Sequence, residues 1–473
     1  MKLARTAPDQ APVLSTVLSM CKSRVIDQQV AACLCATNII RAGFSPQYLH
    51  MDHSSPMTVT HVVNSLISSE MEKPITRTKA CYIMYYLVCD DKDLCQLAFD
   101  RGSLTKLANL VRSITPSEPA PGWDEDEPES IARLREAALT AIAAIALFED
   151  DIRSEVTDTL RMIPHIQISL AHHHPAVRYA ACQCVRSLSR AVSVLRTSIV
   201  DSGLGLSVYQ VFCKEDEDPR VRHAASSVIC NLVTDFSPMK ETLLSQGVIE
   251  RCVKLLDTPE QALALNALWT FKNLLYKSNT DLKRQVMEAL GWRTLQRLLT
   301  HESPDFQEHA FHVARNIADN EAGIEMVFEG LGPSVLLSTV SQGLDSEHDD
   351  VLRQAAFLLG NLANSPKHQR DILSHPRILI SLRQCLIDAK VDVRRPAVAC
   401  VRELIRANPH SYRELHDAGI DTTLRHMCDY GGGLAAASPM ASAFSMGVEE
   451  DSEVREKARE ALRWLERSGE MGM

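Results

Sequence analysis

One small residue recurs through this chain with a spacing that restricts how the chain can fold. Ten positions, called anchors here, each precede an alanine by four residues and an aliphatic residue by eleven. The anchors are Gln28, Thr76, Leu134, Val177, Val221, Leu263, Phe306, Val351, Val393 and Val454. Seven of the nine separations between successive anchors lie between 42 and 48 residues. A fixed period of this length predicts an array of repeated helical units.

The residues at fixed offsets from each anchor predict one buried helix face. At 100° per residue, offsets 0, 4, 7 and 11 fall close together on a helix. The alanine lets a neighbouring helix approach closely, whereas a larger side chain there would cost about 1–3 kcal/mol. The composition, 45% apolar but only 5% aromatic, suits helices. We therefore predict an all-α, armadillo/HEAT-like, right-handed superhelical solenoid of about ten repeats.

Prolines and glycines agree with this period. Three prolines stand two residues before an anchor, where a missing backbone N–H costs a helix nothing: Pro175, Pro219 and Pro304. Five glycines stand fifteen residues after the aliphatic position: Gly102, Gly203, Gly247, Gly332 and Gly419. We expect the prolines to begin helices and the glycines to separate them.

The two longest separations predict insertions that divide the array. Residues 115–130 are acidic and rich in proline, which predicts a solvated loop, and residues 429–451 are rich in Gly, Ala and Ser. The second insertion could be a flexible loop or a short docking segment. The remaining parts are N-terminal armadillo-like repeats at 1–114, central and C-terminal repeats at 131–428, and a final repeat helix at 452–473.

Several function classes find no support in the sequence. The net charge of −10 disfavours nucleic acid, and no stretch reaches the ~18 apolar residues that span a membrane. No phosphate-binding loop or hydrolase motif occurs. His172–His174 have no carboxylate or cysteine at ligand spacing, so we expect solvated turn histidines and no metal. The sequence predicts no catalytic residue, no cofactor and no enzyme, and the start lacks a secretory signal, which predicts a cytoplasmic and nuclear protein.

A second helix face carries the candidate partner-binding groove. Asparagine recurs ten residues after the anchor, aromatic or histidine side chains recur at offset 6, and basic side chains recur at offset 9. The predicted groove residues are Asn231, Trp269, Lys272, Asn273, His312, Arg315, Asn316, Phe357, Asn361 and Arg402. Amides can bind the backbone of an extended peptide while neighbouring rings pack on its side chains. The basic side chains favour an acidic peptide or a C-terminal carboxylate. Alternatively, the asparagines bond to carbonyls of neighbouring helices.

Three stretches carry a family resemblance: VRYAACQCVRSLSRAVSVLRTS at 177–198, VICNLVTDFSPMKETLLSQGVIE at 228–250 and NALWTFKNLLYKSNTDLKRQV at 266–286. Over residues 130–470 the chain resembles the armadillo repeat-containing protein 8 family, which includes subunit 5 of the GID/CTLH E3 ubiquitin-ligase complex. The resemblance implies a non-catalytic scaffold in a hetero-oligomeric complex that promotes proteasomal degradation. It also implies a substrate-receptor subunit bound around Asn231 to Asn361, and LisH/CTLH scaffold subunits bound by more N-terminal repeats.

Two other classes of armadillo protein compete with this interpretation. An adaptor for nuclear transport or signalling would use the same asparagines to hold an extended peptide, although basic cargo needs acidic residues where this chain has basic ones. A cofactor of an Hsp70 chaperone would normally have about four repeats. An enzyme fits the sequence least well.

Overall fold

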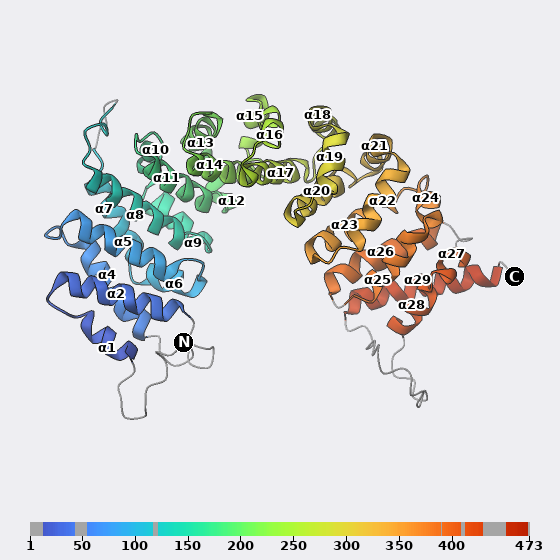
Figure 1. The fold of residues 1–473 in the computed structure, drawn as a ribbon, viewed down its shortest axis with the longest axis horizontal. Coiled ribbons are helices and arrows are strands. Elements are labelled where there is room, and N and C mark those ends of the chain that lie inside the picture. The colour runs from blue at the N-terminus through green and yellow to red at the C-terminus, as the bar shows by residue number, and fades with distance from the viewer. Residues whose placement is uncertain are drawn as a thin grey trace. The chain divides into compact units, whose positions relative to one another are not determined.

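The computed structural model describes residues 13–42, 54–116, 122–388, 390–407, 412–428 and 451–471. Within these ranges every regular element is a helix (Figure 1). The chain forms two compact units, Met1–Val248 and Ile249–Met473, called the first and second unit here. None of the described helices is long and apolar enough to cross a membrane. The predicted insertion at 429–451 lies outside the described residues except for Asp451.

The first unit is a stack of helices in which five long helices contact one another in chain order. These are α2 (Ile26–Arg41), α5 (Pro74–Val88), α8 (Glu129–Ile145), α11 (Pro175–Leu188) and α14 (Pro219–Leu232). A second layer packs on them: α4 (Ser54–Ser68), α7 (Ser103–Ser113), α10 (Ile163–Leu170) and α13 (Leu204–Cys213). Shorter elements connect the layers: α1 (Val13–Met20), α6 (Lys92–Asp100), α9 (Asp150–Ser154), η2 (Glu155–Thr159), α12 (Val192–Val194), η3 (Leu195–Ile199) and α15 (Met239–Ser245).

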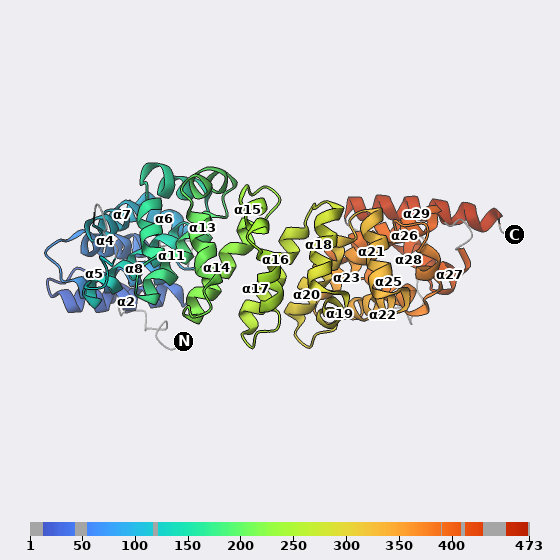
Figure 2. The ribbon, with the colours of Figure 1, turned by 90° about the horizontal axis from the view of Figure 1, so that it is seen from above.

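The second unit repeats this arrangement (Figures 1 and 2). Its long helices, again in contact in chain order, are α17 (Gln261–Leu275), α20 (Pro304–Ile317), α23 (Asp349–Leu362), α26 (Val391–Ala407) and α29 (Ser452–Met471). The second layer holds α16 (Val248–Leu255), which begins at the unit boundary, α19 (Trp292–Leu299), α22 (Pro333–Leu344), α25 (Pro376–Leu386) and α28 (Ile420–Cys428). Short helices precede them: α18 (Thr280–Leu290), α21 (Glu321–Leu331), α24 (Gln369–Ser374) and α27 (Tyr412–Asp417). Three helices per repeat is the armadillo pattern, whereas a HEAT repeat has two.

The predicted register is confirmed in all ten repeats. Each anchor lies in one long helix, and each alanine four residues later is no more than 4% exposed. The aliphatic residue at offset 11 is buried in nine repeats, and only Ile39, in the first long helix, is half-buried. The alanines therefore form the seam along which successive long helices pack.

The predicted helix boundaries are also confirmed. Pro175, Pro219 and Pro304 occupy the first turn of α11, α14 and α20. The five predicted glycines all have a positive φ, between 69° and 80°, which favours glycine, and each directly precedes a second-layer helix. Gly291 (φ 77°) plays the same part before α19, but it falls off the predicted spacing.

Candidate partner-binding face

Aromatic and cationic side chains from three long helices of the second unit form one strip. This cation–aromatic strip consists of Trp269 and Lys272 on α17, His312 and Arg315 on α20, and Phe357 on α23. The Lys272 Nζ atom lies 5.2 Å from the centroid of the Trp269 ring, which is 37% exposed. The Arg315 Cζ atom lies 4.2 Å from the centroid of the Phe357 ring in the next repeat. The structure thus brings together the predicted residues at offsets 6 and 9.

A hydrogen bond positions one of the two cations of the strip. Arg315 Nη1 donates a hydrogen bond to Gln354 Oε1 at 3.0 Å, which holds the guanidinium beside the Phe357 ring. Such stacked cation–aromatic pairs contribute on the order of 0.5–2 kcal/mol, depending on how far they are desolvated. Because cation and ring are already paired, both can contact a partner without being reoriented first.

His312 supplies a neutral ring to the strip. Burial lowers the pKa of His312 to about 3, and the nearby charges of Lys272 and Arg315 act in the same direction. The Glu308 carboxylate also lies beside the strip. Its contact with the His309 ring lowers the pKa of Glu308, which favours the charged form. The strip therefore presents two cations, three rings and one neighbouring acid near neutral pH.

Arg402, predicted as a further cation of the groove, is balanced by acids. Its guanidinium lies 2.8 Å from a Glu403 carboxylate oxygen on the same helix, α26. It also lies 3.5 Å from Glu460 Oε2 on α29. The predicted positive rim therefore does not extend to α26, because the acids that neutralise Arg402 include one from the next repeat.

The asparagines join successive long helices. In three repeats the side-chain amide at offset 10 donates to a backbone carbonyl at offset 9 of the preceding repeat: Asn231 to Arg186 (3.4 Å), Asn316 to Lys272 (2.8 Å) and Asn361 to Arg315 (3.1 Å). Asn231 also donates to Ser189 Oγ at 3.0 Å. These carbonyls belong to the ends of helices, which lack partners within the helix. The geometry supports the structural alternative for these amides, and peptide binding by them, or by Asn273, stays a prediction.

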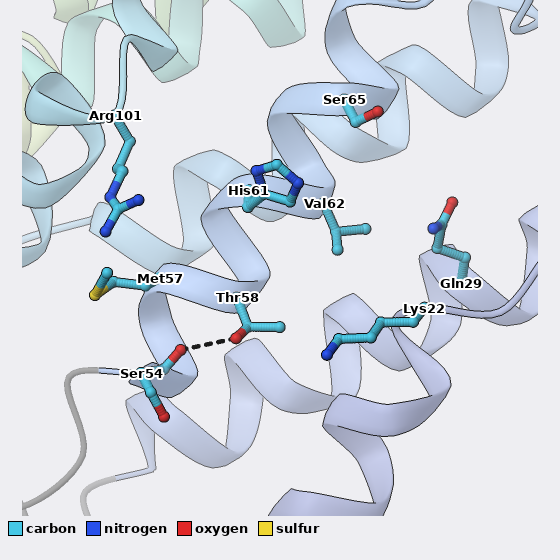
Figure 3. A pocket seen from close by; sticks show the side chains of 9 residues that line it. All are labelled: Lys22, Gln29, Ser54, Met57, Thr58, His61, Val62, Ser65 and Arg101. Atoms are coloured by element: carbon cyan, nitrogen blue, oxygen red, sulfur yellow. Dashed lines mark hydrogen bonds between the residues drawn. The ribbon is translucent and has the colours of Figure 1, made fainter.

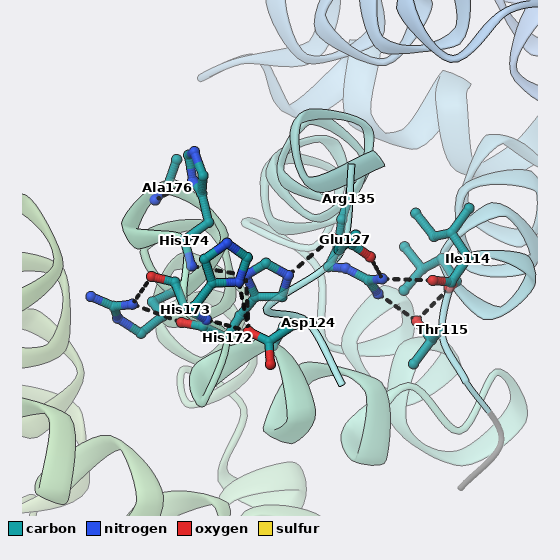
Figure 4. Close-up of polar contacts among 12 residues, drawn as sticks. Ile114, Thr115, Asp124, Glu127, Arg135, His172, His173, His174 and Ala176 are labelled. Carbon is teal, nitrogen blue, oxygen red and sulfur yellow. Dashed lines mark hydrogen bonds and ion pairs between the residues drawn. The ribbon is translucent and has the colours of Figure 1, made fainter. Parts of the chain in front are cut away.

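Most of residues 122–130 are exposed, as predicted for the first insertion, but the prediction of solvated side chains is wrong for Asp124, Glu127 and His172. The carboxylates of Asp124 and Glu127 are 9% and 6% exposed, and His172 is 1% exposed. His172 Nε2 lies 3.0 Å from Glu127 Oε2, and His173 Nδ1 lies 2.9 Å from Asp124 Oδ2 (Figure 4). The acids and histidines are 45 to 49 residues apart in the sequence, so only the stacking of repeats brings them together.

Arg135 on α8 completes this buried network, which we call the loop clamp (Asp124, Glu127, Arg135, His172 and His173). Its fully buried guanidinium contacts Glu127 Oε1 at 2.6 Å and donates to Ile114 O and Thr115 Oγ1, both at 2.6 Å. Burial acts to raise the pKa of Glu127, but the contacts with His172 and Arg135 outweigh burial and lower it. The loop clamp fastens the insertion to α8 and to the turn before α11.

The clamp also contains the described residues that come nearest to a metal site. One ligand atom from each of Asp124, His172 and His173 lies within 4.8 Å of the others. However, His172 Nδ1 accepts the backbone N–H of His174 at 3.0 Å, and its Nε2 faces Glu127. Both ring nitrogens therefore already have partners, and the arrangement is explained as a structural network.

The fold defines a class: an armadillo-type helical-repeat protein, whose second unit carries the half-exposed cation–aromatic strip. A HEAT repeat profile matches residues 162–192. The crystal structure of an engineered protein shares the fold, with a TM-score of 0.63 and 17% identity over 96% of this chain and 98% of that one.

Sequence relatives confirm the predicted family resemblance. Armadillo repeat-containing protein 8 of Danio rerio is 28% identical over 60% of this chain and 42% of its own length. The Pongo abelii protein is 25% identical over 84% of this chain and 58% of its own length. GID complex subunit 5 of Schizosaccharomyces pombe is 26% identical over 53% of this chain and 32% of its own length. The chain is thus related to the armadillo repeat-containing protein 8 and GID complex subunit 5 family, and it spans less than two thirds of these relatives.

Proposed function

We propose that this protein is a non-catalytic scaffold subunit of a GID/CTLH-type E3 ubiquitin ligase. In this role it docks a substrate-receptor subunit, contacts LisH/CTLH scaffold subunits and so promotes proteasomal degradation, in the cytoplasm and nucleus. The observation that carries the proposal is the similarity to proteins named GID complex subunit 5, which extends over 53% of this chain for the Schizosaccharomyces pombe protein and 40% for the Saccharomyces cerevisiae protein. The ubiquitin chemistry would then belong to other subunits.

The cation–aromatic strip is the proposed docking surface for the receptor. Lys272 and Arg315 would pair with acidic side chains or a C-terminal carboxylate, while Trp269 and Phe357 would pack on apolar side chains. Rings and arginines in such positions often dominate binding energy, and one truncation can cost 2 kcal/mol or more. The Trp269 ring on α17 and the Phe357 ring on α23 lie two repeats apart along the stack. Together they suit an extended segment of the partner rather than a single residue.

A transport or signalling adaptor is the second candidate, and one comparison favours it. Importin subunit alpha-1b of Oryza sativa is 21% identical over 257 residues, 53% of this chain. The charge of the strip argues against basic cargo, because Lys272 and Arg315 would repel it. Binding of a lysine-rich peptide to the strip, at an affinity equal to that of an acidic peptide, would favour the adaptor.

Affinity purification of the tagged chain from its native cell, followed by mass spectrometry, tests the proposed function. The scaffold role predicts recovery of LisH/CTLH proteins and RING subunits. Recovery of nuclear-transport receptors without these proteins would support the adaptor instead. Ubiquitin transfer by the purified chain alone would contradict a non-catalytic role.

A further inference from the structure

A hollow lies against α4 in the first unit, whereas the cation–aromatic strip belongs to the second unit. It has a volume of about 630 Å³ and adjoins a second hollow of about 510 Å³. His61, Ser65 and Arg101 line both hollows, so they form one continuous site, called the α4 pocket here. Its other lining residues are Lys22, Gln29, Ser54, Met57, Thr58, Val62, Asn64, Ser68, Ser69 and Lys106.

The charge of the α4 pocket is unusual for this protein. Among the described residues that line it there are three cations, Lys22, Arg101 and Lys106, and no Asp or Glu, although the whole chain carries a net charge of −10. None of the three cations forms an ion pair with another described residue. Arg101 and Lys22 extend toward α4 from different segments, one before α7 and one in the turn before α2 (Figure 3). An anion that binds between such like charges offsets their mutual repulsion, which favours binding.

Neutral groups in the pocket can add hydrogen bonds. Ser65 and Ser69 line it, whereas the hydroxyls of Thr58 and Ser68 already donate to backbone carbonyls of α4. Asn64, only 4% exposed, donates its amide to the Arg101 carbonyl at 3.1 Å, which anchors the segment that carries the Arg101 guanidinium. The Asn64 Oδ1 atom is buried and has no hydrogen-bond partner within the described part of the chain. Because this oxygen is covered by the protein itself, the part that Asn64 plays at the pocket is to hold the Arg101 segment in place.

We propose that the α4 pocket binds a phosphorylated serine or threonine in an extended segment of a partner protein. A phosphate monoester carries a charge of about −1.5 to −2 and offers three acceptor oxygens, which suits this cationic pocket better than one carboxylate does. Arg101 can bond two phosphate oxygens at once, while Lys22 and Lys106 act as point charges. This site does not depend on the proposed ligase role.

Peptide binding to the full-length chain tests the proposal. The probes are a fluorescent peptide library with one fixed phosphoserine and randomised flanks, its unphosphorylated twin and a twin with glutamate at the fixed position. We expect the phosphorylated library to bind at least tenfold more tightly than either twin, and binding to weaken as salt rises. Arg101→Gln should reduce binding roughly tenfold or more. The matched control is Lys79→Gln, an exposed cation of the same unit outside the pocket, and it should change nothing.

Four outcomes would overturn the proposal. Equal binding of the phosphorylated library and its unphosphorylated twin would show that the pocket does not recognise phosphate. Equally tight binding of the glutamate twin would show that a carboxylate suffices. Equal binding by the Arg101→Gln and Lys79→Gln variants would place the site elsewhere. Competition by inorganic phosphate at the concentrations that bind the library would indicate a small-anion site instead of a peptide site. Arg101 and Lys79 are both exposed, so unchanged thermal unfolding confirms that the variants fold.

Discussion

Arg133 and Arg135 are two residues apart on α8, but they differ in burial and therefore in their expected contribution to the free energy of unfolding. Arg135 is fully buried in the loop clamp, whereas Arg133 pairs with Glu129 in solvent. Removing one partner of a buried pair leaves an uncompensated charge, so Arg135→Ala should lower the free energy of unfolding by about 3–5 kcal/mol. Arg133→Ala should cost less than about 0.5 kcal/mol. Urea unfolding measures both, and equal losses would mean that the clamp adds no stability.

His312 makes stability depend on pH in a defined direction. Its pKa of about 3 lies below the value of 6.5 for an ordinary histidine, so the unfolded chain binds this proton more tightly than the folded chain. Stability is therefore lost as pH falls below about 6.5 and is unaffected by this residue above that pH. Between pH 6.5 and 4.5 the wild type should lose about 2 kcal/mol more than His312→Gln.

The measurement is urea unfolding of both proteins at the two pH values. Using the difference between wild type and variant cancels the titration of all other groups. Equal losses in the two proteins would show that His312 titrates normally and is not held neutral by the strip.

At the scale of the helix, the alanine seam sets how closely long helices pack. Ala267 on α17 is 2% exposed, whereas Ala262 on the same helix is exposed. Ala267→Leu should overpack the seam and cost about 1–3 kcal/mol, while Ala262→Leu should change stability by less than about 0.5 kcal/mol. The difference is measured as a shift in thermal unfolding, and a tolerated Ala267→Leu would refute close packing at the seam.

The long helices could be predicted from the sequence because each carries several turns of the same pattern. The first helices of the repeats could not, since α6, α9, α15, α24 and α27 have only five to nine residues and show little periodicity. Close contacts between helices could not be predicted from the sequence either. For example, a Cβ atom at Gly330 on α21 would lie 2.1 Å from the Trp292 ring. Such approaches depend on neighbours distant in the sequence.

The same distinction holds for the binding surfaces. The strip was predictable because its residues keep fixed offsets from the anchors. The partners of Arg402 and His172 were not, since Glu460 and Glu127 come from other repeats. The asparagine amides proved to have internal partners because the carbonyl that each one meets belongs to the preceding repeat. Offsets predict which face a residue occupies, but not what the next repeat places beside it.

At the scale of the whole molecule, the proposed surfaces lie in different units and should act independently. Trp269→Ala together with Phe357→Ala alters the second unit, and Arg101→Gln alters the first. Substitutions at sites that share no residues or partners have additive effects. We therefore expect the strip double variant to bind the phosphorylated peptide library as the wild type does, by fluorescence anisotropy. A loss of more than threefold would show that the two sites are coupled.

The docking role of the cation–aromatic strip is tested most directly by purifying tagged variants from the native cell and quantifying their partners. The comparison is between Trp269→Ala with Phe357→Ala and a control, Tyr86→Ala, which removes a 50% exposed ring from the first unit. We predict that the double variant loses the substrate-receptor subunit but still recovers the LisH/CTLH and RING subunits, whereas the control keeps the receptor. Full retention of the receptor by the double variant, with its fold intact, would contradict the account.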